Sequence, residues 1–439
     1  MRLFGTMDRM ITKIHRGALL LGMVVLSGCN LILAPRQVIE PQPTVPQTIS
    51  EPVATHLFKI NDDDDVVGEL QITRATKDDT LSDIARRFNL GYEELVRANP
   101  GVDPWLPGEG REIVLPTQFV LPNAQRQGLV VNLAAMRVFY FPKRKDGEQQ
   151  TVITHPIGIG KVGWVTPEGV TKVISKKKNP VWVPPLSVRK EHAENGDPLP
   201  KVVPPGDDNP LGAYAMTLSW PGYLIHGTNK PYGVGMRSSH GCMRFYPEDI
   251  ALLFNEIDIG TIVQVVNQRV VSGWHNGKLF MQVMPPPEEE APETKAVEVK
   301  KEKLDKTKQG KNTITTQPFS VNAAMARLFQ QAKQHAVIVD QAMIDQLTKE
   351  QTNVTYPVTA GVTTSQVIAS ARRVDNALPK GATWDGSTTL MVTAEEFEAM
   401  HNGTILPKKE EPSAAEASKP NTKPANPARK TKIVATPAT

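Results

Sequence analysis

Between Gly128 and about Val283 the chain is a succession of short runs rich in β-branched and aromatic residues, separated by turn residues. Two of these runs, 129–133 and 137–141, flank a short break and predict a β-hairpin. One helix is expected at 247–256, with Pro247 in its first turn and Ile250, Leu253 and Phe254 on its buried side. Many short strands with few helices favour a sandwich or a barrel. Further strands are expected at 151–159, 171–175, 214–218 and 261–266.

One of the two cysteines of the chain, Cys242, lies inside this β-rich region between Gly241 and Met243. Thiolate is the reactive form of cysteine, and a thiol with a pKa of about 8.5 needs a cationic or hydrogen-bonding neighbour to supply it at neutral pH. His226 and His240 are the two candidate neighbours. Because the surrounding residues are polar or glycine, Cys242 is a candidate nucleophile rather than a small buried apolar residue.

The other cysteine, Cys29, follows four basic residues and the apolar run 17–26. That run is shorter than the roughly 20 residues that span a bilayer, so residues 1–28 predict a secretion signal, with an uncleaved anchor as the alternative. The sequence before Cys29 resembles a bacterial lipobox, which implies a lipid on Cys29, and Asn30 favours the outer membrane. Cys242 would then have no disulfide partner.

Composition places few limits on function beyond excluding nucleic acid as a partner. The chain has 439 residues and a formal net charge of +4, and its lysines concentrate in linkers and in the tail. Its length predicts two or three domains. The run 62–65 of four aspartates lacks the EF-hand spacing of a calcium site, so a solvated loop is expected. No pattern indicates a metal ion or a cofactor.

The segment 68–116 predicts a strand, two helices and a second strand. Asp79 or Thr80 could cap the first helix, and Asn99 and Pro100 end the second. This βααβ unit resembles a LysM module, a family that binds the sugar backbone of peptidoglycan. Asp78 and Thr73 depart from the family pattern, so a packing module without glycan affinity is the alternative. The resemblance rests on Asp79-Thr80-Leu81, Ile84-Ala85, Phe88, Leu95, Asn99-Pro100 and Ile113 to Pro116.

The segments His226-Gly227-Thr228 and Ser239-His240-Gly241-Cys242 resemble the active-site signature of YkuD-type L,D-transpeptidases. Histidine precedes cysteine here, the reverse of the papain-like order, so a papain-like hydrolase is excluded. The resemblance implies a YkuD-like β-sandwich in a mainly β catalytic domain, and carbapenem-type β-lactams should acylate Cys242. The flanks 166–169, 174–180, 204–206, 209–212 and 232–237 are similar to the LysM-bearing Gram-negative branch, although Arg244 stands where asparagine is common.

Carried over by this resemblance, Cys242 is the nucleophile and His226 the proton acceptor, with its ring held by the backbone near Gly227. Gly241 and Cys242, with His240, would supply oxyanion-hole N–H groups, while a loop-bracing role for His240 stays open. Trp220 and Tyr223 are expected to pack rather than bind. Substrate-binding candidates are Arg244, Ser239, Arg237 and Tyr232. The two arginines could hold a stem-peptide carboxylate, because guanidinium groups pair with carboxylates.

The implied reaction is acyl transfer through a thioester, without a cofactor. The donor is a tetrapeptide stem that loses D-alanine. The acceptor is the diaminopimelate amine of another stem or the C-terminal lysine of an outer-membrane lipoprotein. Water would instead make the chain a carboxypeptidase or an amidase, and a non-catalytic wall-binding lipoprotein is a further alternative. Glycan strands are an expected partner of the LysM-like module, and the expected location is the periplasm.

Beyond Pro285 the resemblance ends and a separate, α-rich C-terminal region is expected. Ser320 could cap a helix that places Met325, Leu328, Phe329 and Ala332 on one face, and Ser365 could start a helix through Val374. Thr393 begins a capping box, Gly403 marks a helix end, and His335 and His401 are expected at the solvated surface. The expected division is 1–28 signal peptide, 29–64 tether, 65–118 LysM-like module, 125–285 catalytic domain, 286–317 disordered linker, 318–405 accessory domain and 406–439 disordered tail.

Overall fold

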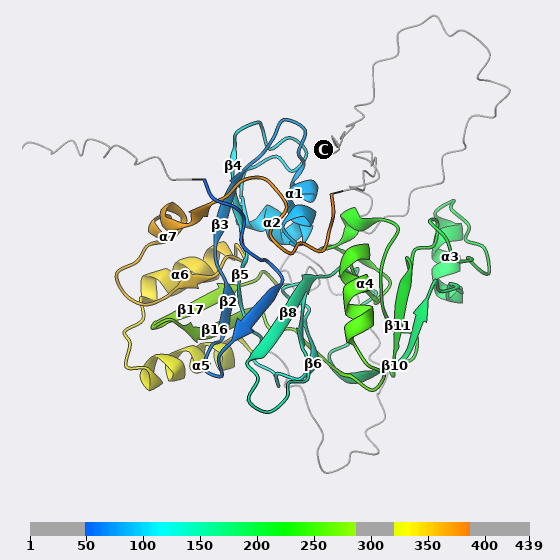
Figure 1. The fold of residues 1–439 in the computed structure, drawn as a ribbon. Helices are drawn as coiled ribbons and strands as arrows, with labels where there is room; N and C mark the ends of the chain where they lie inside the picture. The colour runs from blue at the N-terminus through cyan, green and yellow to red at the C-terminus, as the bar shows by residue number, and fades with distance from the viewer. Residues whose placement is uncertain (1–48, 287–319, 387–439) are drawn as a thin grey trace, which may run out of the picture. The chain divides into compact units, whose positions relative to one another are not determined.

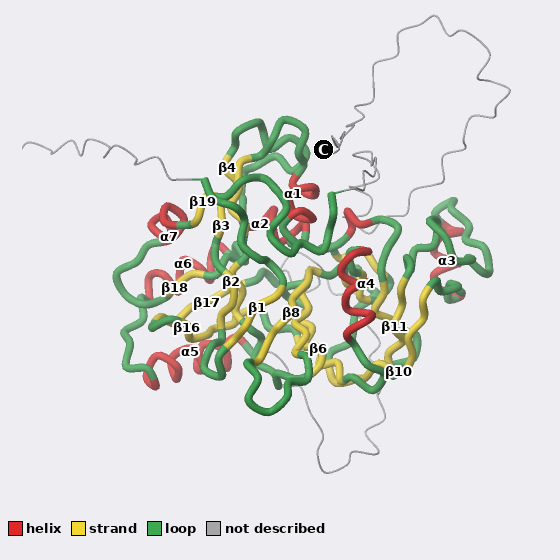
Figure 2. The backbone as a smooth tube through the Cα atoms, in the orientation of Figure 1, coloured by secondary structure: helices red, strands yellow, loops and turns green. Residues whose placement is uncertain are grey.

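The structure, a computed structural model, describes residues 49–286 and 320–386, all within one unit of the chain, Thr48–Thr439. Figures 1 and 2 show how the elements of these residues are arranged. The expected signal peptide with Cys29, the capping box at Thr393, the helix end at Gly403, His401 and the tail lie outside the described residues. Within the described ranges, no helix combines the length and apolar character needed to cross a membrane.

The β-rich region forms a nine-stranded mixed sheet in the order β1-β8-β7-β6-β15-β10-β11-β12-β14. The predicted hairpin is confirmed, since Val130 faces Phe139 across antiparallel β6 and β7. The strand expected at 151–159 ends at Pro156, and Ile159–Gly160 forms β9, which pairs with β13 (Arg237–Ser239). The nine strands are β1 (Leu57–Ile60), β6 (Gly128–Asn132), β7 (Arg137–Phe141), β8 (Gln150–Pro156), β10 (Gly169–Lys178), β11 (Tyr214–Leu218), β12 (Leu224–His226), β14 (Met243–Arg244) and β15 (Ile262–Val266).

In the middle of this sheet both faces are covered, and every residue of β6 is buried although successive residues of a strand point to opposite sides. In β6, Leu129 and Val131 enter a core that includes Ile250 and Leu253 of α4 (Pro247–Glu256). Val130, between them, enters a second core with the helices of the LysM-like module. The continuous apolar run of β6 therefore reflects two covered faces. The predicted helix 247–256 is confirmed, with Pro247 in its first turn.

The LysM-like module consists of β3 (Gln71–Arg74), α1 (Leu81–Arg87), α2 (Tyr92–Ala98) and β4 (Glu112–Leu115), as the sequence predicts. Thr80 caps α1, and its hydroxyl accepts from the Asp83 N–H while the Asp83 carboxylate accepts from the Thr80 N–H. The apolar face of α1 is fully buried, as is Phe88. Two shorter strands, β2 (Val66–Gly68) and β5 (Gln118–Val120), flank the module and pair with each other.

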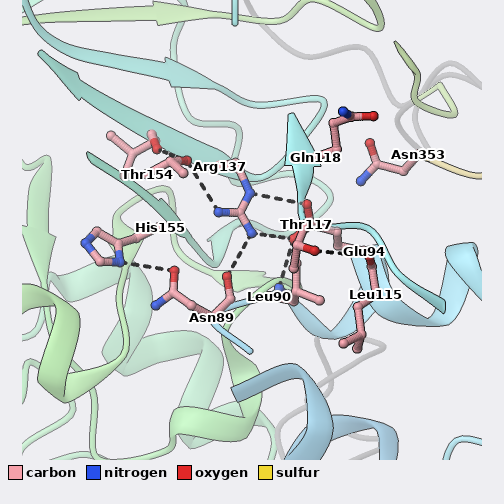
Figure 3. A network of polar contacts seen from close by, with 12 residues as sticks. Asn89, Leu90, Glu94, Leu115, Thr117, Gln118, Arg137, Thr154, His155 and Asn353 are labelled. Carbon is pink, nitrogen blue, oxygen red and sulfur yellow. Dashed lines mark hydrogen bonds and ion pairs between the residues drawn. The ribbon is translucent and has the colours of Figure 1, made fainter. Parts of the chain in front are cut away.

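The module is fixed to the catalytic sheet by close backbone contact and by a buried ion pair. A Cβ added to Gly235 would lie 2.3 Å from the Cα of Gly91, so only glycine permits this approach. Figure 3 shows Arg137 of β7 directed at Glu94 of α2 and at the Asn89 carbonyl. The Arg137 guanidinium donates to Glu94 Oε2 at 2.7 Å and to Asn89 O at 2.9 Å, and its side chain is 1% exposed.

The C-terminal region shares its core with the rest of the described chain. Leu328 of α5 (Val321–Gln334) and Ile344 of α6 (Gln341–Glu350) pack with Met281 of β17 (Lys278–Val283) in one cluster. Two short strands of this region extend sheets that begin elsewhere. Strand β18 (Tyr356–Pro357) pairs with β17, which also pairs with β16 (Val270–His275), and β19 (Arg372–Arg373) pairs with β3 of the LysM-like module.

Several details of this region differ from the sequence prediction. Ser320 caps α5 as predicted, but Phe329 is 43% exposed, because the buried stripe runs through Leu328 and Ala332 instead. The helix expected from Ser365 to Val374 is α7 (Thr364–Ser370), capped by Thr363. Val374 N–H donates to Ile72 O, so that residue extends a sheet. His335, expected at the solvated surface, is partly exposed and stacks on Trp274 with ring centroids 3.8 Å apart.

The expected tether and aspartate loop also contain structure. Strand β1 pairs antiparallel with β8, so residues 57–60 belong to the catalytic sheet. Asp62 and Asp63 are exposed, as a solvated loop predicts. Asp64 instead binds His275 at 2.8 Å, and Asp65 forms an ion pair with Arg126 at 2.7 Å. The expectation of a wholly solvated loop is therefore wrong for these last two residues.

Acid should weaken the fold through His56, which is 7% exposed and stacks on His155 at 5.6 Å. Burial, and next the neighbouring His155, lower the pKa of His56 to about 4. The unfolded chain therefore binds this proton first, so stability is complete above about pH 6.5 and is lost as pH falls toward 4. The loss at pH 5 should be about 2 kcal/mol. Urea unfolding at pH 7 and at pH 5 measures this loss of stability. In His56→Phe the free energy of unfolding should change less between the two pH values than in the wild type. An equal change in the two proteins would contradict the assignment to His56.

Candidate active site

Strands β12 and β14 bring the two sequence motifs together. They pair in parallel, with Ile225 opposite Met243 and His226 opposite Arg244. Ile225 and Met243 are both fully buried in the catalytic core. Alternation along a strand turns His226 and Arg244 to the other face. By the same register Cys242, directly before β14, comes opposite Leu224, two residues before His226 in β12.

His226 is a buried, neutral imidazole with a fixed tautomer. The residue is 4% exposed, and its Nδ1 lies 2.6 Å from the Gly227 carbonyl oxygen. A carbonyl only accepts hydrogen bonds, so Nδ1 carries the proton and Nε2 presents a lone pair. Burial, and next the positive charge of Arg244, lower the pKa of His226 to about 3. At neutral pH the ring is therefore unprotonated, which leaves Nε2 able to accept a proton, although a pKa this low makes the resting imidazole a weak base.

Cys242 is half-buried and rests as a thiol. Its Sγ lies 3.7 Å from the Gly222 carbonyl oxygen. Burial raises the pKa of Cys242, although a hydrogen bond with the Leu224 backbone and the charge of Arg244 act in the opposite direction. A thiol with a raised pKa needs a base to become a nucleophile at neutral pH. Tyr223 lies close to this loop, and burial, and next the negative charge that a Cys242 thiolate would carry, raise the pKa of Tyr223.

The nucleophile loop, residues 239–242, is braced by two hydroxyl groups. Ser239 Oγ donates to the Cys242 carbonyl at 2.6 Å and accepts the Gly241 N–H at 3.2 Å. Thr166 Oγ1 donates to the Gly241 carbonyl at 2.9 Å. Gly241 has φ +99°, a conformation that favours glycine, and an added Cβ would lie 3.0 Å from the Tyr223 ring. In this structure the Gly241 N–H, expected in an oxyanion hole, is thus donated within the loop.

The His240 ring contacts an insertion between β10 and β11. Its Nε2 lies 2.9 Å from Glu191 Oε2 in α3 (Leu186–Glu194). Trp164 meets the ring edge-on, with centroids 4.8 Å apart. Burial lowers the pKa of His240, while the Glu191 charge opposes the shift. The geometry therefore favours His226, rather than His240, as the base for Cys242.

The expected substrate-binding residues lie around the same face. Arg244 Nη1 donates to Ser238 Oγ at 3.3 Å, and its buried Nε has no hydrogen-bond partner among the described residues. Tyr232 belongs to the short 3₁₀ helix η1 (Pro231–Gly233) and contributes electrostatically to Arg244. Arg237 lies in β13. Ser239, by contrast, uses its hydroxyl inside the nucleophile loop.

Replacing Arg244 should shift the titration of both reacting groups. Its positive charge stabilises the thiolate and disfavours the imidazolium, so Arg244→Gln should raise the pKa of Cys242 and that of His226. The pH dependence of iodoacetamide alkylation, followed on the Cys242 peptide by mass spectrometry, should move to higher pH. Lys190→Gln, at an exposed position of α3, is the control. A shift to lower pH would contradict the role of Arg244.

Three contributors to the site were not predicted as site residues, although Thr166 lies in the flank 166–169 that resembles the family. Thr166 and Glu191 act on the nucleophile loop from 75 and 49 residues away. Tyr223 was expected only to pack; it does pack against the catalytic core with Trp220, yet it also borders Cys242. A tyrosine next to a turn and a glutamate on a polar helix are common, so only the tertiary structure singles them out.

Comparison with known proteins agrees with this geometry. Residues 126–265 match the model of the L,D-transpeptidase catalytic domain, YkuD, and residues 74–116 match the LysM domain. The chain is 42% identical over 212 residues to "Probable L,D-transpeptidase YcfS" of Escherichia coli, which is 47% of this chain and 65% of that protein. It is 38% identical over 257 residues to "Probable L,D-transpeptidase YbiS" of Escherichia coli, which is 58% of this chain and 81% of that protein.

A third relative is "Probable L,D-transpeptidase ErfK/SrfK" of Salmonella typhimurium, 44% identical over 191 residues, 43% of this chain and 60% of that protein. The chain thus spans less than two thirds of YcfS and of ErfK/SrfK, and about four fifths of YbiS. The expected mainly β catalytic domain and the LysM module are both confirmed. Since the chain is 38% identical to YbiS over 81% of that protein, and β12 and β14 bring its histidine and cysteine motifs together, this chain belongs to the L,D-transpeptidase family.

Proposed function

We propose that this chain transfers an acyl group between peptidoglycan stem peptides or from a stem to another amine, with Cys242 as the nucleophile. The observation that carries the proposal is the pairing of a resting thiol with a buried imidazole. His226 is unprotonated at neutral pH, its Nδ1 is bound to the Gly227 carbonyl, and its strand pairs with the strand that Cys242 directly precedes. The neutral imidazole can take the thiol proton as negative charge develops on Sγ, because a neighbouring negative charge raises the pKa of the ring.

The first half-reaction breaks the bond between diaminopimelate and the terminal D-alanine of a tetrapeptide stem. His226 Nε2 takes the Cys242 proton while Sγ bonds to the diaminopimelate carbonyl carbon. The tetrahedral intermediate then collapses, and D-alanine leaves with the proton from the imidazolium. The product is a thioester on Cys242. In the second half-reaction an amine attacks that carbonyl, its proton passes to His226, and the sulfur leaves as thiolate, which is protonated again.

Stabilisation of the oxyanion is assigned to the Cys242 N–H, with Gly241 and His240 as further candidates. The Gly241 N–H is already donated to Ser239 Oγ, so it would contribute only after a rearrangement of the loop. Losing one oxyanion donor costs about 10²–10³ in rate. Arg244, with Arg237 and Tyr232, is the proposed site for a stem-peptide carboxylate, because the buried Nε of Arg244 is a donor without a partner among the described residues.

The acceptor and the location are proposed from the family and from the sequence. The acceptor is the diaminopimelate amine of a second stem, or the C-terminal lysine of an outer-membrane lipoprotein. The expected lipid on Cys29 would hold the enzyme in the periplasm, at the outer membrane. The LysM module would bind glycan strands close to the stems. The accessory region 318–405 would support this module, since β19 extends its sheet.

Analysis of muropeptides tests the proposed function. Purified full-length protein is incubated with disaccharide tetrapeptides, with and without a peptide that ends in lysine, and the products are identified by mass spectrometry. The expected result is D-alanine release together with a cross-linked or lysine-linked product. Cys242→Ala should form none of these products. Tripeptide alone would identify a hydrolase, and equal product profiles for the two proteins would exclude catalysis by Cys242.

A further inference from the structure

An insertion of about 35 residues between β10 and β11 carries α3 next to the nucleophile loop, and Figure 2 shows this helix among long loops. The insertion is closed by its own bonds. Trp182 and Val203 exchange backbone hydrogen bonds at 2.9 and 2.8 Å. Buried Asn209 donates from Nδ2 to the Pro180 and Pro204 carbonyls at 2.9 and 3.0 Å. These bonds close the base of the insertion that carries α3.

Glu191 is the residue of α3 that reaches the nucleophile loop. One carboxylate oxygen lies 2.9 Å from His240 Nε2, and the other pairs with Lys161 Nζ. Partial burial opposes ionisation, but hydrogen bonding from Lys161 and the charge of His240 hold the pKa of Glu191 below its usual value. Glu191 is therefore an ionised acceptor, and His240 donates to it from Nε2. Exposed Glu194, one turn further along α3, faces solvent instead.

The second partner of Glu191 is tied to the same loop. The Lys161 N–H donates to the Ser239 carbonyl at 2.9 Å, and the Trp164 N–H donates to the Lys161 carbonyl at 2.9 Å. Trp164 and His192 stand against the His240 ring, at centroid distances of 4.8 and 6.1 Å. The two oxygens of Glu191 thus join three pieces of chain, namely α3, the segment that begins at Lys161 and the nucleophile loop.

From this arrangement we infer that Glu191 is a positioning residue that acts through His240 to fix the backbone on which Cys242 attacks. The inference rests on the proposed function. His240 lies two residues before Cys242, and its ring nitrogen is occupied by a carboxylate from a different element. Without the bond to Glu191 the nucleophile loop keeps the hydrogen bonds of the Ser239 and Thr166 hydroxyl groups but loses its contact with α3. A displacement of about 1 Å at a reacting group can cost about 10²-fold in rate.

A double-mutant cycle on donor acylation tests the inference. Glu191→Ala and His240→Ala are each expected to lower kcat for D-alanine release about 10-fold, with KM changed less than about twofold. The double variant should be no slower than either single variant, because each single change already removes the contact between Glu191 and His240. Glu191→Gln keeps an acceptor for the His240 N–H and should retain most of the activity. Glu194→Ala, on the same helix, is the matched control and should equal the wild type.

Thermal unfolding of each variant separates positioning from folding. If Glu191→Ala is unfolded at the assay temperature, Glu191→Asp replaces it in the cycle. The aspartate side chain is one methylene shorter, so its carboxylate does not reach His240. Unchanged kcat in a folded Glu191→Ala or Glu191→Asp variant overturns the inference, and so do additive losses in the cycle or a loss confined to KM. Failure of the wild type itself to release D-alanine would instead overturn the proposed function.

Discussion

Replacing His226 with alanine is expected to lower the rate of Cys242 acylation by a carbapenem about 10²–10⁴-fold. The reason is the protonation state of Cys242 and of His226 before the reaction. Burial raises the pKa of the Cys242 thiol and lowers the pKa of His226 to about 3, so the thiolate is scarce at neutral pH and the imidazole is a free base. Removing the imidazole leaves the thiol without this proton acceptor.

Intact-mass spectrometry over time measures this rate directly. The adduct should map to the Cys242 peptide in the wild type. His335→Ala is the matched control, because His335 stacks on Trp274 in the C-terminal region and should not affect acylation. Added imidazole should restore part of the rate of His226→Ala by occupying the vacated space. Acylation of His226→Ala at the wild-type rate would show that a different group takes the proton.

Replacing Arg137 with methionine is expected to lower the free energy of unfolding by about 3–5 kcal/mol. Arg137 forms a buried ion pair between the catalytic sheet and the LysM module, and Figure 3 shows its polar contacts. Its guanidinium donates to both oxygens of Glu94, at 3.2 and 2.7 Å, and stacks 4.0 Å from the Phe119 ring. Once Arg137 is gone, the Glu94 carboxylate stays buried without its charge partner, although it still accepts the Gly91 N–H.

Urea unfolding of the full chain measures this loss. A second change, Glu94→Gln in the Arg137→Met background, removes the uncompensated charge and should recover part of the stability. Lys143→Ala is the control, since Lys143 pairs with Asp258 at 3.6 Å on the open surface and should change stability by less than about 0.5 kcal/mol. If Arg137→Met costs no more than this surface variant, the module is not held by the buried pair.

Local patterns predicted most of the elements, because their causes lie within a few residues. The β6–β7 hairpin and helix 247–256 follow from side-chain periodicity, and Ser320 caps α5 as its position suggests. Helix α6 was not predicted, although Asp340 caps it and Met343, Ile344 and Leu347 lie at helical spacing on its buried side. Strands β18 and β19 have two residues each and exist only because β17 and β3 offer open edges.

For the active site, the motifs gave the reacting pair but not its supports. His226 and Cys242 could be paired on chemistry and on family resemblance, since both carry recognisable flanks. The tautomer of His226 is fixed by the carbonyl of its own neighbour, Gly227, and is therefore also a local property. Thr166 and Glu191 brace the loop across long sequence separations, which only the folded sheet and the α3 insertion bring together.

The central claim, a thioester between Cys242 and a stem peptide, is tested most directly by acid-quenched mass spectrometry. Full-length protein is mixed with a disaccharide tetrapeptide, quenched within seconds and digested. The predicted result is a Cys242 peptide heavier by the donor minus D-alanine, formed together with free D-alanine and absent from Cys242→Ala. Release of D-alanine by Cys242→Ala, or an adduct on any residue other than Cys242, would contradict the account.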